Sequence, residues 1–201
     1  KHGIYATFMA KPMQGEPGSA LHLHQSVVDI KTGRNIFVRE DGSDSALFHA
    51  YIAGLQKYVP QALILFGPYV NSYRRFTRYL AAPINVQWGY DNRTVGLRVP
   101  RSDPENRRIE NRIAEADVVP YLAIAASLAC GYMGMMEGLE PSEPITGSAY
   151  KLEQALARDL FTALDLMENC EPLREIFGPE FLELYCAIKR AAQESYFQVI
   201  S

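Results

Sequence analysis

Cysteine is scarce in this chain. Three occur among the 201 residues, Cys130, Cys170 and Cys186, and none lies in a C-x-x-C spacing. The sequence therefore offers no thiolate metal site. We interpret the three as small buried apolar side chains, and their low number is typical of a protein from a reducing compartment, the cytoplasm.

Long hydrophobic runs are also missing. The apolar stretch at residues 122–136 is shorter than the roughly 20 residues that a membrane span needs. Asp117 and Glu137 flank it. Pro120 is typical of a first helical turn, so the stretch predicts a buried core helix and no membrane partner.

Repeats, low-complexity tracts, Gly/Ser linkers, a P-loop and a serine-hydrolase elbow are absent as well. Apolar residues make up 48% of the chain, which is enough for a sizeable core, and the totals predict one domain. The formal net charge of −3 argues against bulk binding of nucleic acid. Because the chain begins with Lys1 and soon enters a predicted strand, we expect a piece of a longer protein.

Residue patterning predicts an α+β domain, with a strand-rich part (1–113) followed by a helical part (114–201). The predicted strands span 4–10, 20–29, 35–38, 84–89, 94–99 (joined to the previous strand across 91–93) and 108–113. The predicted helices span 46–58 (capped by Asp44 or Ser45), a short stretch from Pro60 to about 67, 118–137, and the remainder from about 152, with breaks near 171–172 and 178–179.

The segment from Ala20 to Ser26, A-L-H-L-H-Q-S, alternates strictly, as a strand does. His22, His24 and Ser26 share one face, and mostly apolar residues share the other. A loop of turn-forming residues, 11–19, precedes the strand, and a flexible loop leading into a polar strand face is typical of a phosphate or metal site. A single histidine is more often structural, but two on one face followed by a serine favour a functional role.

Residues 108–112 form a second polar strand. Its two-residue period places Arg108, Glu110 and Arg112 on one face, with isoleucines behind. A surface ion-pair ladder of little energetic value is the alternative interpretation, but the apolar opposite face favours a cleft. Mg²⁺ and Mn²⁺ prefer oxygen ligands and accept imidazole, so His22 and Glu110 are candidate metal ligands.

Nine arginines lie between residues 74 and 112. Such a run is most often a solvated face, yet several of these arginines alternate with apolar residues and so share one side of a sheet. The guanidinium fork suits carboxylates and phosphates, which favours a ligand such as ATP. Nucleic acid is the alternative, disfavoured by the acidic total, and it would show binding that falls steeply with salt.

Together, these segments resemble the glutamine synthetase family in the order that the family has them. The matches run from about residue 5 to residue 138, and the resemblance implies a curved, mostly antiparallel sheet that lines the active site, with helices packed behind. The matching segments are Lys11-Pro-Met13 with Gly18-Ser-Ala-Leu-His-Leu-His-Gln-Ser26, Asn71-Ser-Tyr-Arg-Arg75, Asn92-Arg93 through Arg98-Val-Pro100, Arg107-Arg-Ile-Glu-Asn-Arg112, and Pro120-Tyr-Leu122.

The resemblance also implies an activity. Family enzymes convert L-glutamate and ATP to a γ-glutamyl phosphate, which an amine then attacks, and metals and cationic side chains suit the charge on the phosphoryl oxygens. The implied roles are metal binding (Mg²⁺ or Mn²⁺) for His22 and Glu110; nucleotide contact for His24 and Ser26; phosphate binding for Arg93, Arg98 and Arg108, with Arg93 also stabilising the transferring phosphoryl group; and glutamate binding for Gly18, Arg75 and Arg112.

One departure from the family concerns the amine. Ammonia-using members carry a glutamate on a mobile flap just before an Ala-Pro pair; here the pair is Ala82-Pro83, and Ala81 precedes it. A flap carboxylate would help to bind ammonium and remove its proton, and alanine does neither. The sequence therefore favours a ligase that joins glutamate to a polyamine or another primary amine. Glutamine synthetase proper and a non-catalytic relative are the alternatives.

Family members place further acidic metal ligands and a small N-terminal domain upstream of the matching segments, and they assemble into rings, typically dodecamers in the bacterial type. We therefore expect residues 1–201 to be a single partial catalytic domain that is inactive by itself. Its parent is expected to be a homo-oligomer.

Overall fold

The computed structural model describes residues 2–199 and contains one small mixed sheet. Its four strands lie in the order β1-β4-β3-β2, with β4 antiparallel to both β1 and β3, and β2 parallel to β3. All four precede residue 113, as predicted. Their bounds are β1 Leu23–Gln25, β2 Trp88–Tyr90, β3 Leu97–Val99 and β4 Ile109–Asn111.

The strands are shorter than predicted. No strand forms at 4–10, where residues 4–9 are exposed and no neighbouring strand pairs with them within residues 2–199. Residues 35–38 contribute isolated bridges only. The predicted junction across 91–93 does not make an antiparallel hairpin, because β2 and β3 run parallel. Strands of three residues are short enough for residues 91–96 to return the chain to the start of the neighbouring strand.

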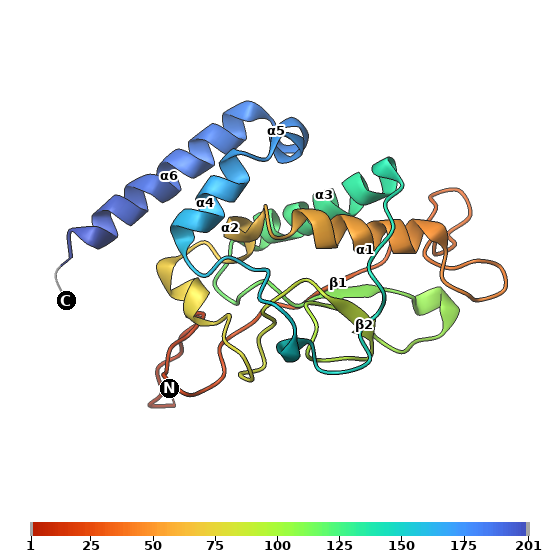
Figure 1. The fold of residues 1–201 in the computed structure, drawn as a ribbon, viewed down its shortest axis with the longest axis horizontal. Helices are drawn as coiled ribbons and strands as arrows, with labels where there is room; N and C mark the ends of the chain where they lie inside the picture. Colours follow the sequence, from red (N-terminus) through yellow and green to blue (C-terminus); the bar gives the residue numbers. More distant parts are fainter. Residues whose placement is uncertain (1, 200–201) are drawn as a thin grey trace.

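Two helices, α1 (Ala46–Tyr58) and α3 (Pro120–Glu137), pack side by side against the sheet (Figure 1). The Ser45 side chain caps α1 by accepting a 3.1 Å hydrogen bond from the Phe48 N–H. The helices approach closely where Gly54 faces Gly134, because a Cβ atom on Gly134 would lie 2.2 Å from the Ala50 carbonyl oxygen. The small residues of α3 therefore allow the close packing of the two helices.

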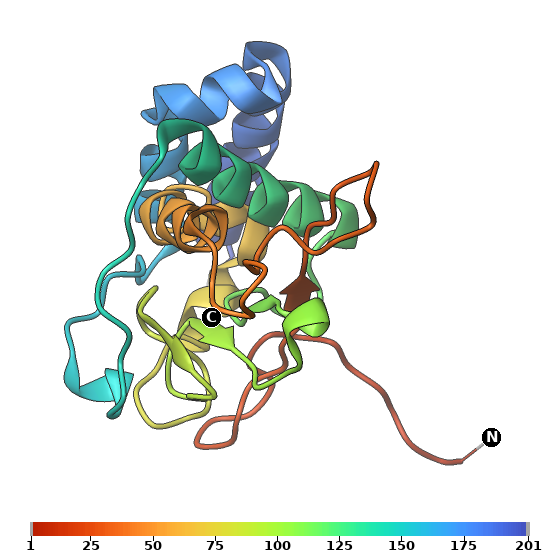
Figure 2. The ribbon, with the colours of Figure 1, turned by 90° about the vertical axis from the view of Figure 1, so that its right-hand side faces the viewer.

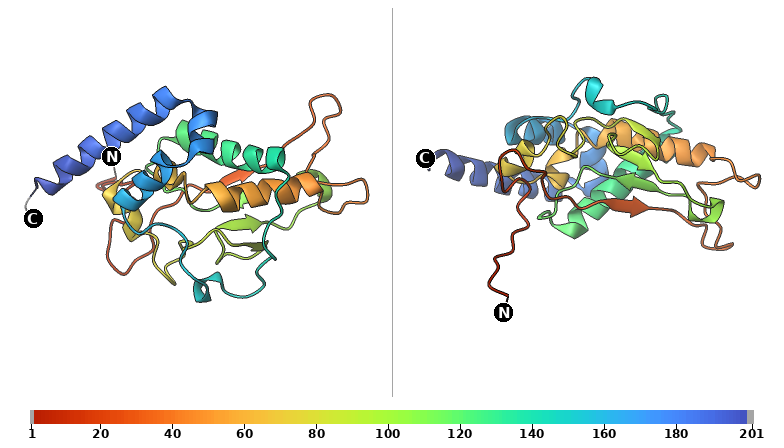
Figure 3. Two further views of the ribbon diagram at one scale, coloured as in Figure 1. Left: turned by 45° about the horizontal axis from the view of Figure 1, so that its top comes forward. Right: turned by 90° about the horizontal axis from the view of Figure 1, so that it is seen from below.

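The other helices form a block beside this pair, and α6 projects from it (Figures 1 and 3). The predicted helix from residue 152 begins later, at residue 160, because Asp159 caps it by accepting from the Thr162 N–H at 2.8 Å. The short helix after Pro60 likewise begins later. The remaining bounds are α2 Leu63–Phe66, α4 Leu160–Glu168, α5 Glu171–Phe177, α6 Pro179–Phe197, and the 3-10 turns η1 Val70–Arg74, η2 Pro104–Asn106 and η3 Ala149–Lys151.

The contacts between the sheet and α3 decide which strand face is free. The Ser127 hydroxyl of α3 donates to Gln25 of β1 at 2.6 Å and accepts from Asn111 of β4 at 3.0 Å. These side chains therefore point toward α3, and their strand neighbours point away from it. Figure 2 shows the helices on one side of the sheet and the N-terminal segment leading away on the other.

The core contains the three cysteines, all buried and unpaired, as predicted. None of the helices within residues 2–199 combines the length and the hydrophobicity needed to cross a membrane.

Candidate functional site

Glu110 is the centre of a charged cluster on the sheet face that points away from α3. Strand register places it beside His24 of β1 and Arg98 of β3. Its Oε1 atom lies 2.8 Å from His22 Nδ1 and accepts a 2.9 Å hydrogen bond from Arg112, while its Oε2 atom accepts a 2.8 Å bond from Arg98. The two polar strands predicted from the sequence therefore converge on one carboxylate.

The charge of Glu110 is fixed by these donors. The residue is only 2% exposed, and such burial by itself would raise the pKa of a carboxyl group. Hydrogen bonds from His22 and Arg98, together with the positive charge of Arg112, outweigh burial and hold the pKa of Glu110 well below its usual range. Glu110 is therefore an anion at neutral pH, as a metal ligand must be.

Beside this carboxylate lies the predicted nucleotide region. The Nε atom of Arg108 donates to His24 Nδ1 at 3.3 Å. Burial lowers the pKa of His24, and Arg108 adds to this against the opposing charge of Glu110, so the imidazole is neutral at pH 7. Ser26 and Arg93 are exposed, and no hydrogen bond in the described part of the chain ties them to the cluster.

The predicted glutamate-binding residues form a neighbouring group. Arg75 is 3% exposed, and its guanidinium donates to the backbone carbonyls of Ile113 at 2.6 Å and Arg112 at 3.1 Å. Burial lowers the pKa of Arg75 to about 10, so it stays cationic at neutral pH. Gly18 packs on its stem: a Cβ atom there would lie 3.0 Å from Arg75 Cγ. The structure thus brings Gly18, Arg75 and Arg112 together.

Asn71 attaches the loop at residues 11–19 to this group. Its side-chain oxygen accepts from the Lys11 N–H at 2.7 Å, and its side-chain nitrogen donates to the Lys11 carbonyl at 3.0 Å. Ser19 N–H also donates to the Ala10 carbonyl at 2.9 Å, which closes the loop at its base. The loop therefore has a fixed entry beside Arg75.

The donors at His22 and Glu110 suit a hard divalent cation. Within residues 2–199 they are joined by no further histidine, cysteine or acidic residue in a grouping of three that could hold a metal. Mg²⁺ commonly takes one or two protein ligands and completes its shell with water and phosphate oxygens. One imidazole and one ionised carboxylate, already 2.8 Å apart, fit such a partial site.

Ala81 lies on a strained loop beyond Arg75. Its φ of 65° and that of Tyr79, 64°, fall in the left-handed region that non-glycine residues rarely adopt. Ala81 is exposed, whereas Ala82 and Pro83 are buried. The loop therefore presents residue 81 to solvent and anchors itself on the pair that follows.

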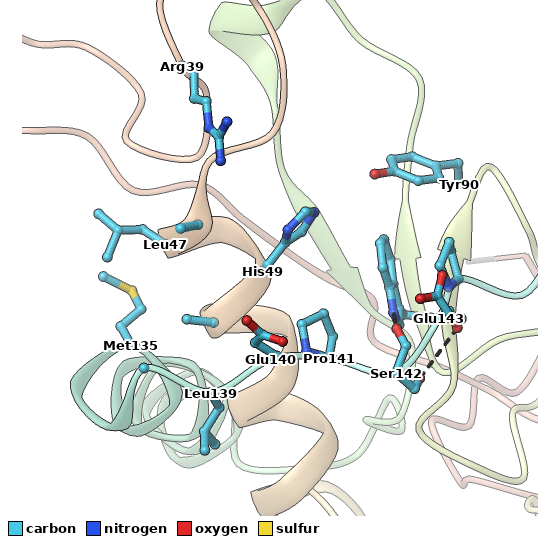
Figure 4. Close-up of a pocket in the computed structure, with 15 residues that line it drawn as sticks. Arg39, Leu47, His49, Tyr90, Met135, Leu139, Glu140, Pro141, Ser142 and Glu143 are labelled. Atoms are coloured by element: carbon cyan, nitrogen blue, oxygen red, sulfur yellow. Dashed lines mark hydrogen bonds between the residues drawn. The ribbon is translucent and has the colours of Figure 1, made fainter.

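A cavity that is separate from this cluster opens near the start of α1. It has a volume of about 590 Å³ and is formed by the start of α1, the loop after α3 and the end of β2, with His49, Tyr90, Glu140 and Glu143 on its walls (Figure 4). It contains none of the predicted site residues. The Glu110 cluster remains the candidate site, because His22, Arg98 and Arg112 converge there on one carboxylate at hydrogen-bond distance.

The sequence analysis did not identify two acidic residues, Asp91 and Glu115, that bond to side chains near the site. Asp91, predicted only as a turn residue, forms an ion pair with Arg98. Glu115 is fully buried and accepts from Ser72 at 2.7 Å. A charge inside the apolar run Ile113-Ala-Glu-Ala116 was the available signal for Glu115; for Asp91, local sequence gave none.

Comparison with known proteins shows the family of this chain. The family model described as "Glutamine synthetase, catalytic domain" matches residues 1–201. A glutamate–isopropylamine ligase from a Pseudomonas species is 40% identical over 195 residues, covering 94% of this chain and 42% of the relative. The γ-glutamylputrescine synthetase PuuA of Escherichia coli K12 is 37% identical over 191 residues, covering 94% of this chain and 40% of the relative.

A glutamine synthetase from Pyrococcus abyssi is nearly as similar, 35% identical over 208 residues, covering 99% of this chain and 46% of the relative. The chain thus spans less than half the length of these relatives. A solved structure titled "Apo GmaS without ligand" superposes with a TM-score of 0.84 at 28% identity, covering 97% of this chain and 46% of that one, which confirms the predicted fold. The chain belongs to the glutamine synthetase family, and residues 1–201 match its catalytic domain.

Proposed function

We propose that this chain is part of an ATP-dependent ligase that joins the γ-carboxylate of L-glutamate to a primary amine larger than ammonia. The observation that carries the ligase proposal is the convergence of His22, Arg98 and Arg112 on Glu110. Cations and metal ligands gathered at one buried carboxylate suit phosphoryl transfer, in which negative charge develops on the phosphoryl oxygens.

In this proposal His22 and Glu110 hold Mg²⁺ or Mn²⁺, which supplies positive charge to phosphate oxygens when bound. His24 and Ser26 contact the nucleotide. Arg98 and Arg108 bind phosphate groups, and the exposed Arg93 reaches the transferring phosphoryl group. Their guanidiniums suit phosphate oxygens because each presents several N–H donors in a plane.

Glutamate binding falls to Gly18, Arg75 and Arg112. The buried cation of Arg75 suits a carboxylate, and the missing Cβ of Gly18 leaves room beside it. The γ-carboxylate attacks the terminal phosphorus of ATP, ADP leaves, and the amine then displaces phosphate from the γ-glutamyl phosphate. Glutamate is thereby held while its distal end reacts.

Ala81 supports the choice of a larger amine. An exposed methyl group at this loop position offers no carboxylate to hold ammonium or to accept its proton. Two of the relatives carry amines in their names, isopropylamine and putrescine, although relatives named glutamine synthetase are nearly as similar. Ammonia use is therefore the second candidate.

The test is an assay of the full-length protein with ATP, glutamate and ammonium, putrescine, spermidine, isopropylamine or ethanolamine. We expect phosphate release to depend on glutamate and to be fastest with an organic amine. Ala81→Glu should shift preference toward ammonium, and Ala81→Gln, equal in size and backbone strain but uncharged, should not. A wild-type preference for ammonium overturns the amine assignment, and a lack of turnover with every amine overturns the ligase.

We further propose that the full-length ligase is a homo-oligomer and that residues 1–201 alone are inactive, because His22 and Glu110 cannot complete the coordination of the cations. Assaying the isolated segment beside the full-length enzyme tests this. Turnover by the segment contradicts it.

A further inference from the structure

Two acidic side chains beyond the end of β4, Glu115 and Asp117, have no role in the proposed function. Ser72 satisfies one oxygen of Glu115, at 2.7 Å. The other, Oε2, is buried, as is Asp117 Oδ1, and neither receives a hydrogen bond from an N–H or O–H donor within residues 2–199. The two carboxyl groups lie within hydrogen-bonding reach of each other.

Two ionised carboxylates could not satisfy these oxygens, because a carboxylate only accepts hydrogen bonds. A buried polar atom without a partner is costly, and two adjacent carboxylates repel each other. The nearby Arg75 does not relieve them, since its guanidinium donates to the carbonyls of Ile113 and Arg112. One proton between the carboxyl groups satisfies both oxygens at once.

We propose that Glu115 is a positioning residue for Arg75: Glu115 and Asp117 share one proton, so the pair carries a single negative charge and leaves Arg75 on its backbone carbonyls. The link to substrate rests on the proposed function, in which Arg75 binds glutamate. The shared proton itself does not.

The surroundings support a proton held at neutral pH. Burial raises the pKa of Glu115 to about 8, and the hydrogen bond with Asp117 adds to this, against Ser72 and the charge of Arg75. Tyr73 also faces Glu115 from η1, and Tyr185 and Lys189 face it from α6.

Ionisation above pH 8 would place a second negative charge beside Arg75. The guanidinium would then be drawn toward the pair and away from the carbonyls of Ile113 and Arg112 that now orient it. Glutamate binding should weaken as a result.

Infrared spectroscopy of the full-length protein tests the shared proton. Wild type should show the C=O stretch of a protonated carboxyl group at pH 6 and lose it as the pH rises through about 8. Glu115→Gln and Asp117→Asn should each remove this band, whereas Glu105→Gln, on an exposed side chain, should keep it. Absence of the band from wild type at pH 6 overturns the proposal, whether or not the variants fold.

Steady-state kinetics at saturating amine test the positioning role. The KM for glutamate in wild type should rise several-fold between pH 7 and pH 9 while kcat changes less. Glu115→Gln should remove that rise, because its amide N–H replaces the shared proton at every pH. If Glu115 is merely structural, the variant should be less stable but its KM for glutamate should change with pH as it does in wild type. That result overturns the positioning role.

These two experiments separate the two proposals. A titrating band in a protein without ligase turnover means that the proposed function is wrong while the shared proton stands. Turnover without the band means that only the present inference is wrong.

Discussion

Glu110 and Glu115 lie five residues apart on one segment, and both are buried, at 2% and 0% exposure. Burial raises the pKa of each, yet the net shifts are opposite. Glu110 receives donors from His22, Arg98 and Arg112, whereas Glu115 receives one hydroxyl and faces a second acid. Depth does not set the charge of a buried carboxyl group in this protein; the hydrogen-bond donors around it do.

The two glutamates therefore affect stability in opposite pH ranges. The pKa of Glu110 is lowered from 4.5, so its contribution is present above that pH and is lost as the pH falls. The pKa of Glu115 is raised from 4.5 to about 8, so its contribution is full below 4.5 and is lost progressively as the pH rises toward 8. Each effect can be removed separately by mutation.

The largest effect should come from Glu110→Gln. Removing the buried carboxylate leaves Arg112 without an acidic partner and Arg98 with only the exposed Asp91, and we expect the free energy of unfolding at pH 7 to fall by about 3 kcal/mol. Urea unfolding measures it, with Glu105→Gln, an exposed glutamate on the same segment, as control. The variant should also lose part of the wild-type decline below pH 4.5. Wild-type stability in the variant would contradict the assigned charge.

A smaller loss is expected for Arg98→Gln. Glu110 keeps His22 and Arg112 but loses the 2.8 Å bond from Arg98, and a hydrogen bond to a charged group is worth about 2 kcal/mol. The pKa of Glu110 should rise, which moves the acid loss of stability to higher pH. Arg101→Gln, whose side chain is exposed, is the matched control and should be neutral. Equal losses for the two variants would mean that burial of the pair has no energetic effect.

Ser72→Ala acts on the other glutamate. It removes the hydroxyl that donates to Glu115, at a cost of about 1 kcal/mol. Because that bond lowers the pKa of Glu115, the pH range over which stability declines should extend upward. Unfolding measured from pH 5 to pH 9 checks this, with Ser43→Ala, an exposed serine bonded to Asp41, as control. If the upper end of this pH range does not move, Ser72 does not control the ionisation of Glu115.

The smallest effect is expected for Asp91→Asn. Asp91 is an exposed partner of Arg98, and exposed ion pairs contribute little. Arg98 keeps its bond to Glu110, so the unfolding midpoint should stay within experimental error of wild type. A loss as large as that of Arg98→Gln would mean that Asp91, rather than Glu110, holds the guanidinium.

Much of the site could be predicted because strand alternation is local. The pattern of Ala20 to Ser26 fixes which side chains share a face, and residues 108–112 do the same. The pairing of the two strands is a long-range property, yet the charge on each indicated that they would meet. The lengths of α1 and α3 followed in the same way from periodicity and from Ser45 and Pro120.

Other features depend on contacts that no local pattern encodes. Strand 4–10 failed because a strand needs a neighbour, and residues 4–9 have none within residues 2–199. The parallel pairing of β2 with β3 depends on how residues 91–96 turn. The opposite ionisation of Glu110 and Glu115 depends on Arg98 and Ser72, which belong to other segments.

The two hydrogen bonds between Asn71 and the backbone of Lys11 have a mechanical consequence. They join the loop at 11–19 to the turn that precedes Arg75. Displacing the loop must therefore break both bonds or move the turn with it. If glutamate enters by displacing that loop, Arg75 is carried with it. If Arg75 binds glutamate as proposed, the entry of glutamate and its retention are therefore coupled through the side-chain amide of Asn71.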